Sequence, residues 1–384
     1  MDKKRRICLF TAHSPLTGGG GVILRSLIAA LTDFDISWYY VGNNAEPGYE
    51  SGYLGKALMG GDPVKDVLNT WKMLADKKMP YFDSLVQQMA AIECDAYWIV
   101  SHNEGLRLAL ELTRQQSRPV HLTVHDDWAG ALCARSVRYR FMGGWADKLT
   151  AATLKAVDSF DVISAGMRNY YKVLSGKEGE ICHRYLQPDA IMHPGVNGDD
   201  ENAVVTIGHI GSIYDKNDFV AFLSLLREFF NAKGKTPLVK MWGCHLTAND
   251  IPASLKGTVS FYDTLPEEKV IPELSACHFV YAMYPLSKAL GLFSRTSLPT
   301  KLTSYLQAGR PVFGHGPADS TLAAFVTANG LGAMWTSLNK QDGFYALQKV
   351  IVVNLEHNEP ENVRKQYFGE GNLAVMRRVL SNSK

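Results

Sequence analysis

The chain has 384 residues, of which 46% are hydrophobic and 10% aromatic, enough for two domains of common size. Its 40 basic and 38 acidic residues leave a formal net charge of +2, which gives no indication of a nucleic-acid partner. The 6 cysteines include no C-x-x-C pair, and no run reaches the ~18 apolar residues of a membrane span. We therefore expect a cytoplasmic protein whose only membrane contact would be peripheral, at the inner face.

The first half alternates short apolar runs with amphipathic stretches, a pattern typical of βα units around a parallel sheet. It predicts strands at 7–11, 36–41, 96–100, 120–124 and 161–164. It predicts helices at 21–32, 64–76, 82–92, 103–115, 145–157 and 165–174. The glycine-rich polar stretch at 43–62 is interpreted as a loop near an active cleft or as a plain surface excursion.

A stretch of proline, glycine and acidic residues at 187–202 predicts a hinge, after which the βα rhythm begins again. Strands are expected at 203–209, 238–242, 259–262, 279–282, 311–313 and 333–335. Helices are expected at 214–232, 266–275, 300–308, 318–328, 340–354 and 360–380. The fold class is therefore α/β, with two domains built on parallel sheets.

Four consecutive glycines, Gly18 to Gly21, follow the first predicted strand and precede a helix. Backbone without a Cβ can approach a phosphate or a sugar closely, which makes Gly19 and Gly20 candidate ligand contacts. The run has no Gly-Lys-Ser/Thr ending and does not complete G-x-G-x-x-G, so neither an ATP cradle nor a dinucleotide site is supported. The alternative is a flexible turn.

Polar side chains follow two further strands of the first half. His125, Asp126 and Asp127 come directly after 120–124, at the carboxyl edge where α/β proteins bind ligands. His125 and Asp126 are candidates to orient or deprotonate an acceptor hydroxyl, and Asp127 is a candidate on the acceptor side. Capping of the next helix by Asp126 or Asp127 is the competing interpretation.

His102 and Glu104 follow 96–100 and are acceptor-side candidates, although Asn103 as a helix N-cap explains this segment nearly as well. His121 and His125 lie four residues apart on a strand without the Glu of H-E-x-x-H, so zinc is not expected. Asp33 and Asp35 form a D-x-D sequence before the second strand, which is the wrong place for a metal-dependent transferase site.

The second half also begins with a strand and a glycine-containing turn. Gly211 permits close backbone approach, Ser212 offers a hydroxyl, and Lys216 lies in the first turn of the next helix. The N-terminal end of a helix disfavours a cation, so Lys216 there would be explained by a bound anion beside it. The alternative is that Lys216 is simply an exposed lysine. Further on, Gly243 and Tyr262 follow strands and could contact a base, although aromatic core packing also accounts for Tyr262.

The segment 297–314 combines a loop, a short helix and a strand. Ser297, Pro299 and Thr300 predict a helix start, and Gly309 predicts its end. Free N–H groups near this start, with Thr300 and Lys301, would suit a diphosphate. An ordinary helix of an α/β domain is the alternative.

These segments resemble those of retaining GT-B glycosyltransferases, particularly the group called family 4. Residues 211–216 are similar to the family's Gly-x-Leu-x-x-x-Lys sequence, one residue shorter, and 299–312 are similar to its Pro-x-Lys-x-x-Glu-Tyr-x-Ala-x-Gly-x-Pro-Val segment. Residues 193–197 resemble its Asn-Gly-Val-Asp junction, and the run Gly18 to Gly21 occupies the place of its first glycine-rich loop.

The resemblance implies two facing Rossmann-like domains with the active site in the cleft between them. It places an acceptor-side domain at 1–190, a linker at 191–202, a nucleotide-sugar-binding domain at 203–358 and a C-terminal helix at 359–384 that packs back on the first domain. Lys216 and Lys301 would neutralise the diphosphate leaving group, with help from Ser212 and backbone N–H groups at 297–300, while Gly19 and Gly20 close on it. No metal or cofactor is implied beyond the nucleotide-sugar co-substrate, and the acceptor would be a glycan or a lipid-linked molecule.

The chain departs from the family pattern in its charged residues. Thr296 and Ser304 stand where the family has a pair of glutamates, the second of which holds the ribose hydroxyls. Ser212 stands where an arginine often occurs, and Arg295 is a candidate to replace that charge. These departures make a catalytically silent GT-B binding module one alternative. A second alternative is an inverting transferase or a sugar-nucleotide epimerase, which would use Asp126 as base.

Overall fold

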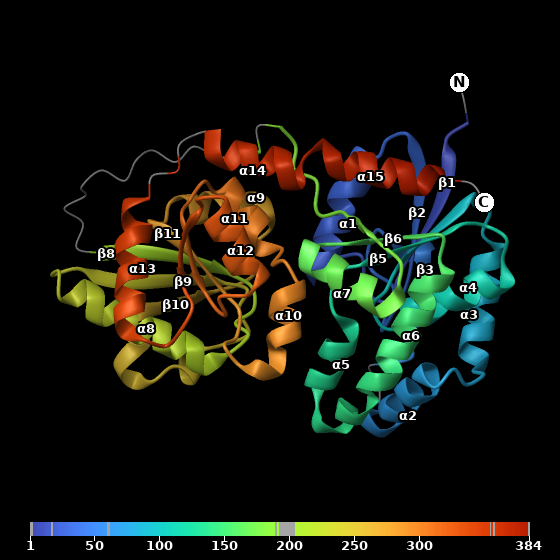
Figure 1. Ribbon diagram of the computed structural model, residues 1–384, viewed down its shortest axis with the longest axis horizontal. Helices are drawn as coiled ribbons and strands as arrows, with labels where there is room; N and C mark the ends of the chain where they lie inside the picture. Colours follow the sequence, from blue (N-terminus) through green and yellow to red (C-terminus); the bar gives the residue numbers. More distant parts are fainter. Residues whose placement is uncertain are drawn as a thin grey trace. The chain divides into compact units, whose positions relative to one another are not determined.

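The computed structural model describes residues 3–16, 18–59, 62–188, 190–191, 204–353, 355 and 358–382, without the side chains of 134, 135 and 358. The chain forms two compact units, one made of Met1–Tyr185 with Glu370–Lys384 and the other of Leu186–Gly369. Figure 1 shows a sheet surrounded by helices in each unit. The predicted linker, including 193–197, lies almost wholly outside the described residues.

Unit 1 contains a seven-stranded parallel sheet in the order β3-β2-β1-β4-β5-β6-β7. Its strands are β1 (Arg5–Thr11), β2 (Phe34–Gly42), β3 (Tyr53–Lys56), β4 (Ala96–Val100), β5 (Val120–Val124), β6 (Ser159–Val162) and β7 (Glu180–Ile181). Every residue of β4 and β5 is buried, as expected of strands covered on both faces. The order reverses at β1, so the switch point of the sheet lies between β1 and β4.

The helices of unit 1 are α1 (Gly18–Ala30), α2 (Pro63–Leu74), α3 (Pro80–Ala91), α4 (Glu104–Gln115), α5 (Trp128–Arg135), α6 (Gly143–Ala156), α7 (Ala165–Ser175) and α15 (Glu370–Ser381). Two 3₁₀ turns, η1 (Glu50–Gly52) and η2 (Val137–Met142), complete it. The sequence did not predict α5, β3 or β7. The segment at 43–62 is therefore not only a loop, because η1 and the edge strand β3 form within it.

Unit 2 contains a six-stranded parallel sheet in the order β10-β9-β8-β11-β12-β13, so it reverses at β8 just as the first sheet does at β1. The strands are β8 (Val204–Ile210), β9 (Thr236–Trp242), β10 (Val259–Tyr262), β11 (Phe279–Met283), β12 (Val312–His315) and β13 (Gly332–Trp335). The helices are α8 (Lys216–Asn231), α9 (Glu267–Ser275), α10 (Gly291–Thr296), α11 (Lys301–Gln307), α12 (Thr321–Ala328), α13 (Lys340–Val352) and α14 (Asn358–Phe368). Three 3₁₀ turns are also present: η3 (Ala248–Asp250), η4 (Ala253–Thr258) and η5 (Lys288–Leu290).

The core of unit 2 packs α8 and α13 against the strands. The predicted apolar face of the first helix, Phe219, Leu223, Leu226 and Phe230, is fully buried. The ring of Phe222 stacks on Tyr281 of β11 with centroids 3.8 Å apart.

The C-terminal region forms two helices rather than the single one predicted. In unit 2, α14 is held by Arg364, whose guanidinium donates to the Leu186 carbonyl at 2.9 Å. In unit 1, the Asn372 side chain of α15 accepts from the His183 N–H at 2.8 Å. Figure 1 shows α15 beside α1 and β1, in agreement with the hydrogen bond from Arg5 of β1 to the Ser381 carbonyl. The units divide at Tyr185/Leu186 and Gly369/Glu370, whereas the sequence predicted boundaries at 190 and 358.

Candidate functional site

A pocket of about 270 Å³ lies at the switch point of unit 1. Three loops build it, because the carboxyl ends of β1, β4 and β5 meet at one edge of the parallel sheet. It is lined by His13, Gly18, Gly19, Gly20, Val100, Ser101, His102, His125, Asp126 and Trp128. The predicted candidates Gly19, Gly20, His102, His125 and Asp126 therefore come together here.

Three histidines face this pocket. The rings of His13 and His102 meet edge to face, with centroids 5.9 Å apart. Burial lowers the pKa of His125 to about 4, with the other histidines adding to the effect and Asp161 opposing it. Burial also lowers the pKa of His13. Because the imidazoles of His13 and His125 are neutral near pH 7, a ring nitrogen of each is available to accept a hydrogen bond or a proton from a hydroxyl.

The glycine run begins α1 rather than forming the predicted loop before it. Gly18 has a φ of +72°, which only glycine adopts without strain. A Cβ added at Gly20 would lie 2.8 Å from His125 Nδ1. The glycines therefore let the first turn of α1 approach the histidine directly, which the sequence pattern alone did not indicate.

Asn103 and Asp127 occupy N-cap positions of helices but their side chains do not cap them. Asn103 has a φ of +46°, uncommon for a residue with a side chain, and its side-chain oxygen Oδ1 accepts a hydrogen bond from Trp128 Nε1 at 3.2 Å. The contact fixes the Trp128 wall of the pocket. For Asn103, the contact with Trp128 therefore replaces the cap, whereas Asp127 occupies the N-cap position of α5 without a side-chain cap.

Glu104 and Asp127, predicted on the acceptor side, are buried carboxyl groups that do not line the pocket. The Glu104 carboxylate accepts from the Leu58 N–H, and burial raises the pKa of Glu104 to about 7. Burial also raises the pKa of Asp127 to about 6, with Asp147 and Asp126 adding to it.

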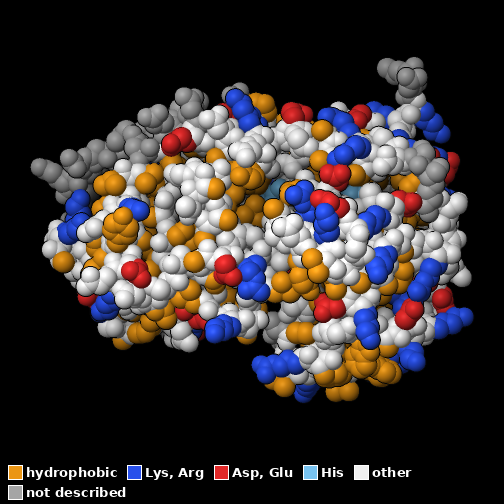
Figure 2. Space-filling model, viewed as in Figure 1, with side chains coloured by type: hydrophobic (Ala, Val, Ile, Leu, Met, Phe, Trp, Pro, Cys, Tyr) orange, Lys and Arg blue, Asp and Glu red, His pale blue; other side chains and the backbone are white. Residues whose placement is uncertain are grey.

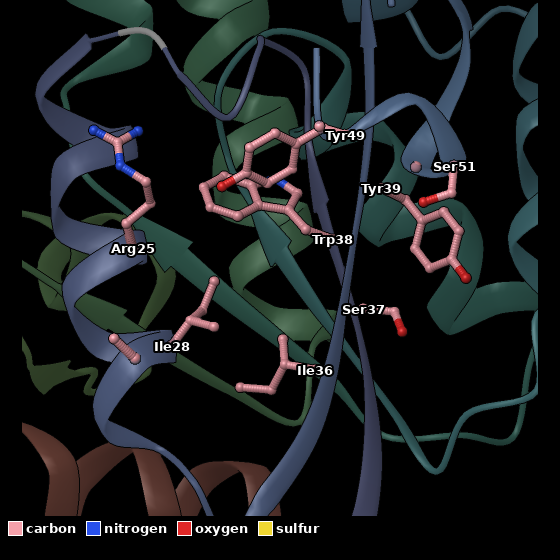
Figure 3. Close-up of a pocket in the computed structure, with 11 residues that line it drawn as sticks. Arg25, Ile28, Ile36, Ser37, Trp38, Tyr39, Tyr49 and Ser51 are labelled. Atoms are coloured by element: carbon pink, nitrogen blue, oxygen red, sulfur yellow. The ribbon is translucent and has the colours of Figure 1, made fainter. Parts of the chain in front are cut away.

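A larger hollow of about 480 Å³ lies elsewhere on unit 1, between α1, β2 and η1 (Figure 3). In Figure 3, Ile36 and Trp38 of β2 point to the side of α1, and Ser37 and Tyr39 point away from it. Its main polar groups are already used, because Trp38 Nε1 donates to Thr11 Oγ1 at 2.9 Å and Arg25 donates to the Pro15 carbonyl. We therefore place the site at the histidine pocket.

In unit 2, Lys301 lies at the corresponding switch point, where the strand order reverses between β8 and β11. Its ammonium donates to the Ser212 carbonyl at 2.9 Å and lies 5.5 Å from the centre of the Tyr214 ring. Burial lowers the pKa of Lys301 to about 7, opposed slightly by Cys244. The structure thus brings together the predicted residues Ser212 and Lys301 from segments 89 positions apart.

The other two predicted cations are paired with carboxylates. Lys216, the first residue of α8, lies 3.2 Å from Asp250, and Arg295 lies 3.5 Å from Asp319. Each pair is substantially exposed, so each contributes little to stability and an incoming anion can compete for the cation.

Ser304 donates to a carboxylate that the sequence interpretation missed. Its hydroxyl lies 2.8 Å from Glu267 Oε1, which also accepts from Gln307 Nε2 at 3.3 Å. Glu267 begins α9, after β10, and so lies at the carboxyl edge of the second sheet. A glutamate is thus present beside the position where the family pattern has one, although it comes from a different helix. Thr296 instead donates to the Leu292 carbonyl within α10.

The remaining donor-side candidates lie in the same set of loops. Gly211 and Gly243 have φ of +74° and +63°, and their N–H groups donate to the carbonyls of Trp242 and Tyr262. Tyr262 is 45% exposed and stacks on Trp242, so one ring face is open to a ligand.

The helix start at 297–300 is arranged differently from the prediction. Ser297 is buried, and its N–H already donates to the Phe293 carbonyl at 2.9 Å. Thr300 is the N-cap residue of α11 but makes no side-chain cap. Gly309 has a φ of +64° just after the helix, which confirms it as the predicted stop.

Other polar motifs have structural partners. His121 lies between Ser159 and Asp161 at 2.8 and 2.7 Å, and Asp33 pairs with Arg377 at 3.3 Å. No group of three or more His, Cys, Asp or Glu among the described residues is arranged to hold a metal ion. Across the described parts of the chain, no helix combines the length and apolar character needed to cross a membrane.

No protein-family profile and no curated protein matches this chain in sequence. Solved structures do match over nearly the whole chain. A UDP-forming α,α-trehalose-phosphate synthase from Burkholderia vietnamiensis is 11% identical, with a TM-score of 0.62 over 98% of this chain and 96% of that one. WaaG, a glycosyltransferase involved in lipopolysaccharide biosynthesis, is 12% identical, with a TM-score of 0.60 over 97% and 98%. A glycosyltransferase involved in avilamycin A biosynthesis is 12% identical, with a TM-score of 0.55 over 98% and 99%.

At this low identity the likeness shows the fold alone. Two parallel-sheet, Rossmann-like units with these neighbours define the GT-B fold, which confirms the predicted fold class.

Proposed function

We propose that this protein is a glycosyltransferase that moves a sugar from a nucleotide-diphosphate sugar to a hydroxyl acceptor, with retention of configuration and without a metal. The observation that carries the proposal is Lys301, a partly buried amine held against Ser212 at the switch point of unit 2. The carboxyl edge of such a sheet is where α/β proteins bind nucleotides. The GT-B fold supports the reaction class, and the similarity of 211–216 and 299–312 to family 4 supports retention.

The chemistry follows from where charge develops. As the bond between the sugar carbon and the diphosphate oxygen breaks, its electron pair passes to the diphosphate. The acceptor oxygen forms the new bond to that carbon, and its proton passes to a phosphate oxygen. Lys301 takes up a proton as the diphosphate binds and stabilises the growing charge, assisted by Lys216 once the diphosphate competes with Asp250.

The donor also needs contacts that fix its nucleoside. Glu267 is the carboxylate we assign to the ribose hydroxyls, because its place beside Ser304 puts two acceptor oxygens where a serine alone offers weaker bonds. Tyr262 offers its exposed ring face to the base, and Gly243 allows backbone approach. Arg295 and Thr300 remain candidates for the phosphates.

On the acceptor side, the histidine pocket of unit 1 orients the acceptor. His125 accepts a hydrogen bond from a hydroxyl beside the attacking one, whose own proton passes to the phosphate, and Asp126, exposed at the rim, contacts further hydroxyls. The acceptor is a glycan or a lipid-linked molecule, in polysaccharide or glycolipid assembly. We place the protein in the cytoplasm with peripheral contact to the inner face of the membrane.

A thermal-shift panel of UDP, GDP, ADP, CDP and TDP, alone and as sugar conjugates without added metal, tests the donor site. A nucleotide at a hundredfold excess over its Kd should stabilise the protein by about 2.7 kcal/mol. Lys301→Ala and Lys216→Ala should lose the shift and the turnover while keeping the fold. Asp250→Ala is the matched control, because it removes the partner of Lys216 but leaves the cation.

The outcomes separate the alternatives. If no nucleotide shifts the wild-type protein, the proposal fails in favour of a silent binding module. A UDP-N-acetylglucosamine 2-epimerase shares the fold with a TM-score of 0.53 and 12% identity, so products are also analysed for an epimerised sugar nucleotide. An inverted product would contradict retention and would assign the base to Asp126.

A further inference from the structure

Unit 1 exposes a group of apolar side chains on three neighbouring elements. Val64 and Leu68 of α2 are 71% and 47% exposed, and Phe141 of η2 is 62% exposed. Val137 at the start of η2 and Trp145 of α6 add to them, at 70% and 37%. We call these five residues the apolar surface. Large apolar side chains gathered on one face mark a binding surface more often than single exposed residues do.

The apolar surface is continuous because Trp71 connects its parts. Val64, Leu68 and Trp71 lie at i, i+4 and i+7 on α2, so they form one stripe on that helix. The opposite stripe of α2, including Thr70 and Met73, is buried in unit 1. The Trp71 and Trp145 rings meet edge to face with centroids 6.4 Å apart, and the Phe141 and Trp145 rings do so at 6.3 Å.

Two arginines of η2 lie beside the apolar residues Val137 and Phe141 in the sequence. Arg138 and Arg140 are exposed, and neither forms a salt bridge with any described residue. Figure 2 shows hydrophobic and Lys or Arg side chains side by side at the lower edge of unit 1, in the region of α2.

This combination selects one kind of partner. Aromatic side chains enter the boundary between headgroups and acyl chains, where an indole is apolar on its faces and polar at its N–H. Arginines beside them are attracted to anionic lipid headgroups by about 1 kcal/mol each. A protein partner would need an acidic groove that fits these side chains, whereas a bilayer needs only negatively charged headgroups.

The position of the apolar surface relates it to the pocket. Helix α5 begins at Trp128, which lines the histidine pocket, and leads to η2, where Val137 and Phe141 lie. The eight residues of α5 span about 12 Å. The pocket and the apolar surface are therefore connected by one short helix.

We propose that the apolar surface, with Arg138 and Arg140, docks unit 1 onto an anionic lipid bilayer. The proposal rests on these surface residues and gives the membrane contact a definite place. It does not depend on which sugar is transferred, so donor binding and lipid binding can fail separately.

Co-flotation with vesicles tests it in the absence of nucleotide. Vesicles of phosphatidylcholine mixed with phosphatidylglycerol should carry the wild-type protein upward, and vesicles of phosphatidylcholine alone should carry far less. High salt should reduce binding. Neutralising Arg138 and Arg140 to Gln should weaken binding about fivefold for each arginine. The double variant Phe141→Ser, Trp145→Ser should weaken it at least about tenfold.

The matched control is Val173→Ser, which removes an apolar side chain of unit 1 that is 88% exposed on α7, outside the apolar surface. It should float like the wild type. Thermal unfolding of the ligand-free variants reports whether they are folded. Absence of flotation by the wild-type protein, or equal flotation by the surface variants, overturns the proposal. So does a wild-type dimer that Phe141→Ser converts to monomer, because a second copy would then cover the surface.

Discussion

Replacing Lys301 with methionine removes the charge at the switch point of unit 2 but keeps an unbranched chain of similar length. Lys301 lies partly buried, and burial lowers its pKa from 10.5 to about 7. The folded protein therefore disfavours the charged form that a diphosphate requires. Lys301→Met should weaken nucleotide binding and, without nucleotide, stabilise the protein.

The pKa shift sets the size of the stability change. At ~1.4 kcal/mol per pKa unit, it corresponds to an upper limit of about 4 to 5 kcal/mol. Partial exposure and the lost hydrogen bond to Ser212 reduce the expected gain to about 1 to 2 kcal/mol. The unfolded chain binds the extra proton between about pH 7 and 10.5, so wild-type stability rises with pH through that window. The advantage of the variant is therefore largest at or below about pH 7 and fades above it.

Thermal unfolding and calorimetric titration measure the two effects together. The gain should raise the Tm by about 2 to 8 °C without nucleotide. Loss of a charge-assisted bond should weaken nucleotide binding by about ten- to a hundredfold. Wild-type affinity should fall above about pH 7, because Lys301 must then take up a proton, and the variant should lack this dependence. Lys235→Met, at an exposed lysine of unit 2, is the control.

One combination of results would refute the reasoning. If Lys301→Met binds the nucleotide as tightly as the wild type and shows the same pH dependence, Lys301 does not contact the diphosphate. If the variant loses both binding and stability, the lysine is a structural residue held by Ser212 and its charge is not penalised by burial.

Three further predictions concern Glu267 of unit 2 and Asp127 and Gly20 of unit 1. Glu267→Gln should keep the Ser304 contact but weaken nucleotide binding about tenfold by titration, whereas the adjacent Glu268→Gln should not; equal effects would exclude a ribose contact. Burial raises the pKa of Asp127 from 3.8 to about 6, so wild-type stability should fall as the pH rises from about 4 to 6. Asp127→Asn should remove this fall in thermal unfolding, and an unchanged pH profile of the variant would contradict the prediction. Gly20→Ala should displace His125 and reduce turnover with little change in donor affinity, and wild-type turnover would argue against the histidine pocket.

The sequence determined the β/α succession and many strand positions. The predicted strands at 96–100, 120–124 and 259–262 agree with β4, β5 and β10 to the residue. The central strands β4 and β5 are buried on both faces, which favours apolar residues, whereas β10 is an edge strand of the second sheet. Helix α5 was missed because eight residues carry little periodicity, β3 because it lies in a glycine-rich polar stretch, and β7 because it has only two residues.

Local sequence patterns also identified several residues of the candidate site, but not their contacts. Local patterns identified His125, Gly20, Ser212 and Lys301 as separate candidates, because loops after buried parallel strands converge at one edge. His13 follows β1 in the same way and could have been found by that rule.

Only the tertiary structure decided which candidates touch. The Glu267 carboxylate reaches Ser304 from 37 residues away, and Asp250 reaches Lys216 from 34. The lowered pKa of Lys301 and the raised pKa of Asp127 follow from burial, which depends on every element packed around them. A sequence specifies which side chains are available at each strand end, whereas the neighbours and burial that set their charge exist only once the chain has folded.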